Sequence, residues 1–128
     1  MQSNPSNLTP PQLEIMNLFW ERGELGVAQV WKVLAERRNV ARNTVQTMLT
    51  RLVQKGCLSV RVEGNAFYFR ARRRRESTLR GVVGNLVDTA FGGSPTGLVM
   101  ALLEDRRITA GEASRIRELI DKAEEDSL

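Results

Sequence analysis

The sequence of 128 residues contains no histidine and a single cysteine, Cys57. Histidine is the side chain that most often transfers protons near neutral pH and the commonest metal ligand, and one cysteine can build neither an internal disulfide nor a thiolate cluster. No nucleophile elbow, phosphate-binding glycine loop or paired-carboxylate spacing is present. We therefore expect no enzyme, no catalytic residue, no metal site and no cofactor, and we interpret Cys57 as a partly buried small apolar residue.

Long hydrophobic runs and a secretory signal are also missing. No stretch is apolar over the roughly 20 residues that a membrane-spanning helix needs. The first residues, MQSNPSNLTPPQ, contain neither the charged nor the hydrophobic region of a signal peptide. We expect a cytoplasmic protein that does not insert into a membrane.

The charges that are present divide unevenly along the chain. Residues 1–75 hold 13 Lys or Arg against 5 Asp or Glu, a net charge of +8, whereas residues 76–128 hold 6 against 10, a net charge of −4. A polyanion would be attracted to the first part and repelled by the second. A basic surface can also serve solubility alone, but the division indicates two parts with different tasks.

The segment 42–54 has the pattern of a helix with two different faces. Apolar residues recur at the spacing of a buried stripe: Val45, Met48, Leu49, Leu52 and Val53. The other side is polar and nearly uncharged: Asn43, Gln46, Thr47, Thr50 and Gln54, with Arg42 and Arg51 at its margins. Amides and hydroxyls can donate to and accept from base edges, and arginines can bind phosphate or guanine. Many solvated helices are polar without a partner, so this segment alone leaves DNA contact and an ordinary surface both open.

A β-hairpin is predicted directly after this helix. Leu58, Val60 and Val62 alternate with polar residues, Gly64-Asn65 supplies a tight turn, and residues 66–70 return as AFYFR. Three further candidate DNA contacts lie on or just after the hairpin: Arg61, Tyr68 and Arg72. For the run of four arginines at 72–75, contact with the DNA backbone and a solvated hinge both stay open.

Two helices are predicted before the segment 42–54. Thr9 and Gln12 form a capping box at the start of the first, whose buried side would carry Leu13, Met16, Phe19 and Trp20. Residues 27–38 form the second, and Leu25 between them is placed to pair with the hairpin. Helix, helix, helix and hairpin in this order is the winged form of the helix-turn-helix fold.

The residues after 75 show a second helical pattern. Three amphipathic helices are expected, separated by Gly92-Gly93 and by a capping box of Thr109 and Glu112. About 50 residues bury too little surface for a comfortable independent core, so we expect these helices to dimerise. The candidate dimerisation residues are Leu79, Val82, Val83, Leu86, Val87, Leu98, Leu102, Ile116 and Ile120.

The fold class follows from these elements. We predict a mainly α protein with a small β-hairpin wing. The expected organisation is a flexible N-terminal arm over residues 1–7, a winged-helix DNA-binding domain over residues 8–75 and a helical dimerisation domain over residues 76–128.

From about Leu8 to Leu119 the sequence resembles the penicillinase repressor family, the BlaI/MecI/CopY type of bacterial transcriptional regulators. Three stretches carry the resemblance: EIMNLFW at residues 14–20, NTVQTMLTRL at 43–52 followed by Lys55-Gly56, and FYF at 67–69. The middle stretch is the most specific of the three. The resemblance implies a homodimer whose winged-helix domains bind a dyad-symmetric operator in double-stranded DNA, while the C-terminal helices join the subunits.

The resemblance also implies roles for individual residues. Asn43, Thr44, Gln46 and Thr47 stand where family members contact bases, and Arg51 stands where they contact phosphate. The best-known members carry Lys and Arg at the positions of Asn43 and Gln46. Because Asn and Gln favour adenine whereas Lys and Arg favour guanine, we expect the operator to differ from the family's usual half-site.

Two regulatory features of the family are altered in this sequence. Copper-responsive members resemble one another in a cysteine-rich C-terminal tail, and the lone Cys57 does not support copper sensing. Antibiotic-responsive members are cut at an Asn-Phe bond by a membrane-bound sensor protease, and the corresponding position here is Ala101-Leu102, within an apolar run. Release by a sensor protease and release by another trigger both stay open.

Our hypothesis from the sequence is a homodimeric, sequence-specific DNA-binding transcriptional repressor that occludes a promoter. Winged helices also serve as docking modules, so the alternative is a protein-interaction adaptor without specific DNA binding. The charge division and the uncharged helix face favour the repressor.

Overall fold

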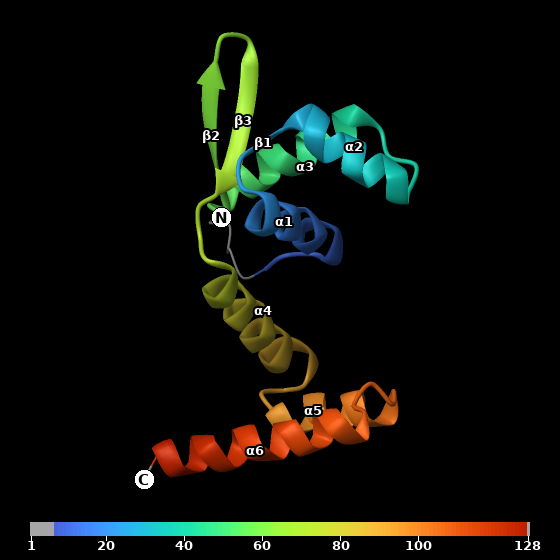
Figure 1. The fold of residues 1–128 in the computed structure, drawn as a ribbon, viewed down its shortest axis with the longest axis vertical. Coiled ribbons are helices and arrows are strands. Elements are labelled where there is room, and N and C mark those ends of the chain that lie inside the picture. The colour runs from blue at the N-terminus through green and yellow to red at the C-terminus, as the bar shows by residue number, and fades with distance from the viewer. Residues whose placement is uncertain (1–6, 128) are drawn as a thin grey trace. The chain divides into compact units, whose positions relative to one another are not determined.

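The computed structural model describes residues 7–127, which divide into two compact units, one up to Asn85 and one from Leu86 (Figure 1). Residues 1–6, which make up most of the predicted N-terminal arm, lie outside the described residues. Asn7, the last residue of that arm, accepts a hydrogen bond through its carbonyl oxygen from Nζ of Lys55.

The first helix, α1 (Pro10–Arg22), starts at the predicted capping box. The backbone N–H of Gln12 donates to Oγ1 of Thr9 at 3.3 Å, and the backbone N–H of Thr9 donates to Oε1 of Gln12 at 3.0 Å. The predicted buried side is only partly right. Met16 and Phe19 are buried as expected, but Leu13 and Trp20 are half-buried. Ile15 and Leu18 are buried as well, because the core covers a wider part of the helix surface than the single predicted stripe.

The next three elements are β1 (Leu25–Gly26), α2 (Val27–Arg37) and α3 (Arg42–Gln54). The helix α2 packs against α3 and buries Val30 and Leu34. Three residues of the predicted α3 stripe are buried, namely Val45, Leu49 and Leu52, whereas Met48 and Val53 are half-buried. After α3, Gly56 adopts a left-handed backbone with φ +78, and the N–H of Cys57 donates to the carbonyl of Leu52 at 2.9 Å. This turn ends the helix and leads the chain directly into the hairpin.

The hairpin consists of β2 (Leu58–Glu63) and β3 (Ala66–Ala71), joined by a tight turn in which Gly64 has φ +61. With β1 they form an antiparallel sheet in the order β1-β3-β2. Leu25 pairs with the hairpin, as expected from the sequence. Its partner there is Phe69, which pairs on its other side with Val60. The order of one helix, a short strand, two further helices and a two-stranded wing confirms the predicted winged-helix fold.

The hydrophobic core of the first unit lies among α1, α2, α3 and the base of the hairpin. Its buried side chains are Leu8, Ile15, Met16, Leu18, Phe19, Leu25, Val30, Leu34, Val45, Leu49, Leu52, Cys57, Leu58 and Phe69. Cys57 is a small apolar residue as predicted, but it is fully buried in the core and not only partly buried, and this burial raises the pKa of its thiol. The core fixes the outward side of α3, because one side of that helix is fully occupied by packing.

The helices after the hairpin are α4 (Arg75–Ala90), α5 (Pro95–Glu104) and α6 (Ala110–Asp126). The expected boundaries are confirmed: Gly92 and Gly93 have positive φ after α4, and Thr109 forms a capping box with Glu112 at the start of α6. Two hydrogen bonds from Thr109 hold the pKa of Glu112 below its ordinary value. The boundary between the predicted domains at residues 75 and 76 stays a prediction, and the compact first unit includes α4 as far as Asn85.

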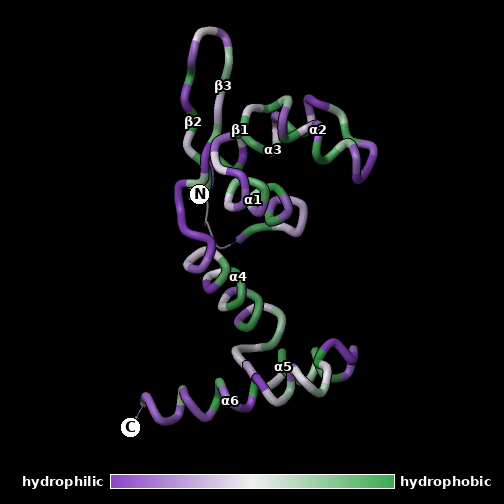
Figure 2. The backbone as a smooth tube through the Cα atoms, viewed as in Figure 1, coloured by the Kyte–Doolittle hydropathy of each residue, from purple (hydrophilic) through white to green (hydrophobic). Residues whose placement is uncertain are grey.

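The second unit buries none of its side chains between Leu86 and Ser127. Figure 2 shows hydrophobic residues recurring along α5 and the first half of α6, whereas the end of α6 is hydrophilic. The large apolar side chains that are exposed here are Leu86, Val99, Met100, Leu102, Leu103, Ile116, Leu119 and Ile120.

Within the described part of the chain, no single helix combines the length and the apolar character needed to cross a membrane, and only the bent pair α4 and α5 reaches both when taken together.

Candidate nucleic-acid interface

The outward side of α3 is the first part of the candidate site. Every residue predicted to face outward on this helix is exposed: Arg42, Asn43, Thr44, Gln46, Thr47, Thr50, Arg51 and Gln54. No acidic residue occurs in α3. Six of these residues line one shallow groove of about 400 Å³ along the helix: Asn43, Gln46, Thr47, Thr50, Arg51 and Gln54. The structure therefore brings together the polar face that the sequence pattern predicted.

The two arginines of α3 retain their charge for an outside partner. Among residues 7–127, no carboxylate forms an ion pair with Arg42 or Arg51. A guanidinium of this kind binds phosphate or guanine well, because it offers several donors in a planar fork.

The threonines of this face have a distinct hydrogen-bonding arrangement. Oγ1 of Thr47 donates to the carbonyl oxygen of Asn43 at 3.0 Å, and Oγ1 of Thr50 donates to the carbonyl oxygen of Gln46 at 3.0 Å. Both hydroxyls therefore bond to the preceding turn of their own helix.

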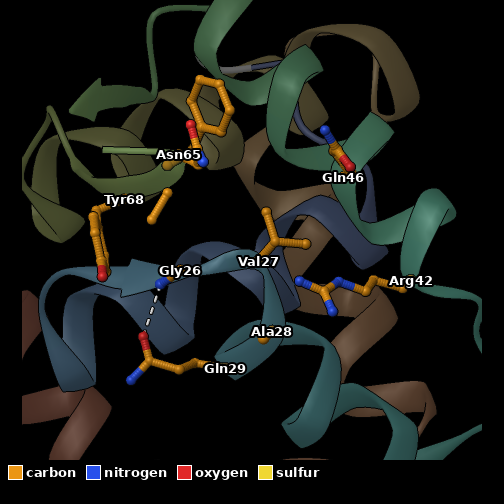
Figure 3. Close-up of a pocket in the computed structure, with 10 residues that line it drawn as sticks. Gly26, Val27, Ala28, Gln29, Arg42, Gln46, Asn65 and Tyr68 are labelled. Atoms are coloured by element: carbon orange, nitrogen blue, oxygen red, sulfur yellow. Dashed lines mark hydrogen bonds between the residues drawn. The ribbon is translucent and has the colours of Figure 1, made fainter. Parts of the chain in front are cut away.

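A second groove, of about 500 Å³, connects α3 with the wing and with the start of α2 (Figure 3). Arg42 and Gln46 come from α3, and Asn65 and Tyr68 come from the hairpin. Gln29 completes the polar lining, and its Oε1 accepts a hydrogen bond from the N–H of Gly26 at 2.8 Å. Sequence reasoning missed Gln29 and Asn65, because no spacing along the chain indicates that these segments meet at α3.

Arg61, a predicted DNA contact on the wing, is already paired within the protein. Its guanidinium donates to Oε1 of Glu24 at 2.8 Å and to Oε2 of Glu63 at 2.8 Å. It also lies over the ring of Tyr68, with 4.8 Å between Cζ and the ring centroid. The two carboxylates raise the pKa of Arg61 further, and the hydrogen bond from Arg61 lowers the pKa of Glu24. The arrangement ties the wing to the segment before β1, so Arg61 has less charge to offer a phosphate than Arg42 or Arg51.

The opposite face of the wing is apolar. The strand register places Val60 and Val62 opposite Phe69 and Phe67. Phe69 is buried at the base of the hairpin, whereas Val60, Val62 and Phe67 are 45%, 58% and 49% exposed. The outer half of the wing therefore presents one apolar face and one face that carries Arg61 and Tyr68.

The arginine run after β3 is held in place by its neighbours. The backbone N–H of Arg72 donates to the carbonyl of Cys57 at 2.9 Å, and Nε of Arg73 donates to the carbonyl of Gly56 at 3.3 Å. The indole N–H of Trp20 donates to the carbonyl of Arg73 at 3.0 Å. Arg73 thus binds the turn that ends α3, while the side chain of Arg72 is exposed and stays a predicted DNA contact.

The predicted dimerisation residues fall into two groups. Leu79, Val82 and Val83 belong to the first unit, where Val82 packs against the hydrophobic core. The others lie in the second unit: Leu86, Val87, Leu98, Leu102, Ile116 and Ile120. Four further large apolar residues are exposed in this unit and were not among the predicted dimerisation residues: Val99, Met100, Leu103 and Leu119.

Comparison with known proteins gives the family. The family model described as penicillinase repressor matches residues 8–122. This chain belongs to the penicillinase repressor family. The family consists of transcriptional repressors and not of enzymes, as we expected from the missing catalytic motifs.

Three similar proteins illustrate the membership. The chain is 22% identical to the penicillinase repressor of Bacillus licheniformis over 115 aligned residues. The aligned region covers 90% of each sequence. The solved DNA-binding domain of the repressor BlaI is 29% identical, with a TM-score of 0.52, and the match covers 59% of this chain and 90% of that one. The monomeric form of Bacillus licheniformis BlaI in complex with the blaP half-operator is also 29% identical, with a TM-score of 0.50, and covers 59% of this chain and 92% of that one.

Proposed function

We propose that this penicillinase repressor family member is a homodimeric repressor that binds a dyad-symmetric operator through α3 and thereby blocks a promoter. The single observation that carries the proposal is the exposed α3 face, which combines amides and hydroxyls with two arginines and contains no acidic residue. Such a face offers donors and acceptors to base edges and cations to phosphates.

DNA contact by the first unit is supported by its charge and by a relative. The net charge of +8 over residues 1–75 attracts a polyanion, and the released counterions would favour binding at low salt. Bacillus licheniformis BlaI was solved in monomeric form with the blaP half-operator, and this chain is 29% identical to it. We infer that each subunit binds one half-site and contacts phosphate through Arg51. The bases would be contacted by Asn43, Thr44, Gln46 and Thr47.

Dimerisation is supported by the second unit. Its apolar side chains are exposed in the single chain, with Leu103 at 55% and Ile120 at 52%, and water contact with so many apolar groups is unfavourable. A second copy of the same helices would cover them. The net charge of −4 over residues 76–128 keeps this part away from DNA, so the two tasks stay separate.

Repression then follows from geometry. Two α3 helices held by one dimer would enter successive major grooves, about 34–36 Å apart, on one side of the duplex. Once one subunit is bound, the second binds as an intramolecular step, which raises the affinity. A bound dimer of this kind excludes RNA polymerase from an overlapping promoter, and separation of the subunits releases the DNA.

A mobility-shift assay with the chain's own upstream DNA tests the proposal. We expect a complex that survives excess unrelated competitor DNA and is lost when Asn43 and Gln46 are both replaced by alanine. The absence of any competitor-resistant complex would contradict the proposal and favour the protein-interaction adaptor.

A further inference from the structure

The hydrogen bonds of Thr47 and Thr50 restrict what these side chains can offer to DNA. Each hydroxyl lies 3.0 Å from a main-chain carbonyl oxygen, that of Asn43 for Thr47 and that of Gln46 for Thr50. A carbonyl oxygen carries no hydrogen and can only accept, so the hydroxyl must be the donor in both bonds. A hydroxyl has one hydrogen. Neither threonine therefore has a hydrogen left for a base.

Two features of each threonine remain available in the groove along α3: the lone pairs of the hydroxyl oxygen and the γ-methyl group. Guanine presents only the acceptors N7 and O6 in the major groove, so it has no hydrogen for such an oxygen. Adenine and cytosine present an amine that can donate, and thymine presents a C5-methyl that packs against another methyl. The two threonines are consequently mismatched to guanine.

The amides next to these threonines narrow the choice to the A·T pair. Asn43 and Gln46, whose carbonyls accept the two bonds, have side chains that can bind N6 and N7 of adenine. Asn43 with Thr47 can thus meet the adenine and the thymine of one A·T pair. Gln46 and Thr50 form the same arrangement as Asn43 and Thr47, shifted by three residues, which is about 4.5 Å along the helix axis. This distance is comparable with the step of about 3.4 Å between nucleotides of one strand.

We infer that α3 reads A·T pairs at the centre of each half-site, with Thr47 and Thr50 as specificity-determining residues whose γ-methyls pack against thymine C5-methyls. The inference rests on the proposed DNA binding and deepens it by naming the bases. Arg42, whose guanidinium is suited to guanine, lies at one margin of the polar face, so guanine belongs at the edge of the half-site.

Selection of binding sites from a random duplex library by the full-length chain is the first part of the test. We expect A·T pairs at the central half-site positions, and central G·C pairs would overturn the inference. If no sequence is enriched at all, the proposed sequence-specific DNA binding fails too. The two failures are therefore distinguishable.

Paired substitutions in the protein and the DNA form the second part. T47V and T50V keep the γ-methyl and remove the hydroxyl, whereas T47S and T50S keep the hydroxyl and remove the methyl. Both sites are exposed on α3, and circular dichroism checks that the four variants remain folded. In the selected operator, replacement of one thymine by uracil removes only the C5-methyl.

The expected pattern of affinities is specific. Uracil at a contacted position should weaken binding of the unaltered chain about fourfold, the factor associated with burying one methyl group. The valine variant of the contacting threonine should keep this sensitivity, and the serine variant should lose it. Equal uracil sensitivity in the serine variants, or none at any thymine in the unaltered chain, would overturn the inference.

Discussion

Side chains of the same chemical type are buried in one unit of this chain and exposed in the other. Leu34 and Leu49 have no exposed surface in the first unit, whereas Leu103 and Ile120 in the second are 55% and 52% exposed. Burial of a leucine side chain contributes about 1.5–3 kcal/mol to the free energy of folding. The first unit gains this contribution within one chain, whereas the exposed leucine and isoleucine of the second unit do not. The comparison shows that the second unit exposes the apolar surface that the proposed dimer would cover, and four predictions test or refine it.

The largest effect is expected from a charge in the exposed apolar surface of α6. I120D should separate the proposed dimer, because a carboxylate in an apolar interface loses its hydration. Operator affinity should fall by a factor of about 100 or more when the second half-site contact is no longer intramolecular. Analytical ultracentrifugation and mobility shifts measure the two effects.

S114D is the matched control, since Ser114 is an exposed polar residue on the same helix and the added charge is the same. It should remain dimeric and bind normally. An I120D variant that stays dimeric with full affinity would show that this surface has another purpose.

Matched leucines compare the two units directly. L49A should lower the free energy of unfolding by about 2–5 kcal/mol, because it leaves a cavity in a closed core. That loss should not depend on protein concentration, since the contacts lie within one chain. L103A should instead cause a loss that changes with protein concentration, as expected for contacts between subunits. Urea unfolding at two concentrations separates the cases, and the same concentration dependence for both variants would contradict the comparison.

The charge difference between the units can be tested with one arginine from each. R51A should weaken binding to all DNA sequences alike and reduce the slope of log affinity against log salt by about 1 per half-site. R117A removes an exposed arginine of α6, in the acidic part of the chain, and should leave the slope unchanged. An unchanged slope in R51A would remove Arg51 from the predicted phosphate contacts.

The smallest effect is expected for the pair of Glu24 and Arg61. The hydrogen bond from Arg61 holds the pKa of Glu24 below its ordinary value, so the pair stabilises the folded state above the unfolded pKa. This contribution is lost as the pH falls through the lowered pKa. NMR titration of the Glu24 carboxyl should show the depressed value, and R61Q should return it to normal. A normal pKa in the unaltered chain would mean that the wing is not held by this pair.

Local signals explain which parts of the structure were predictable. The capping boxes at Thr9 and Thr109 and the turn at Gly64 involve residues no more than three positions apart, so the sequence alone identifies them. The outward face of α3 was predictable for a related reason, because a 3.6-residue period assigns each side chain to one side of a helix.

Contacts between distant residues explain the rest. Arg61 meets Glu24 across 37 positions, and no pattern in the chain indicates that pairing, so Arg61 was predicted as a DNA contact without its internal partners. Gln29 and Asn65 join the groove at α3 only because β1 pairs with β3. Ile15 and Leu18 were missed because α1 is enclosed on more sides than a single stripe.

The indole hydrogen bonds of the first unit have a consequence for spectroscopy. Trp20 donates to the carbonyl of Arg73 and Trp31 to the carbonyl of Val40, and Tyr68 is the one remaining strongly fluorescent residue. All three precede Leu86, so the intrinsic emission of the protein reports only on the unit that is proposed to bind DNA. Melting of α5 and α6 is invisible to fluorescence but visible to far-ultraviolet dichroism. The gap between the two melting curves therefore measures, without any attached dye, how far the two units unfold independently.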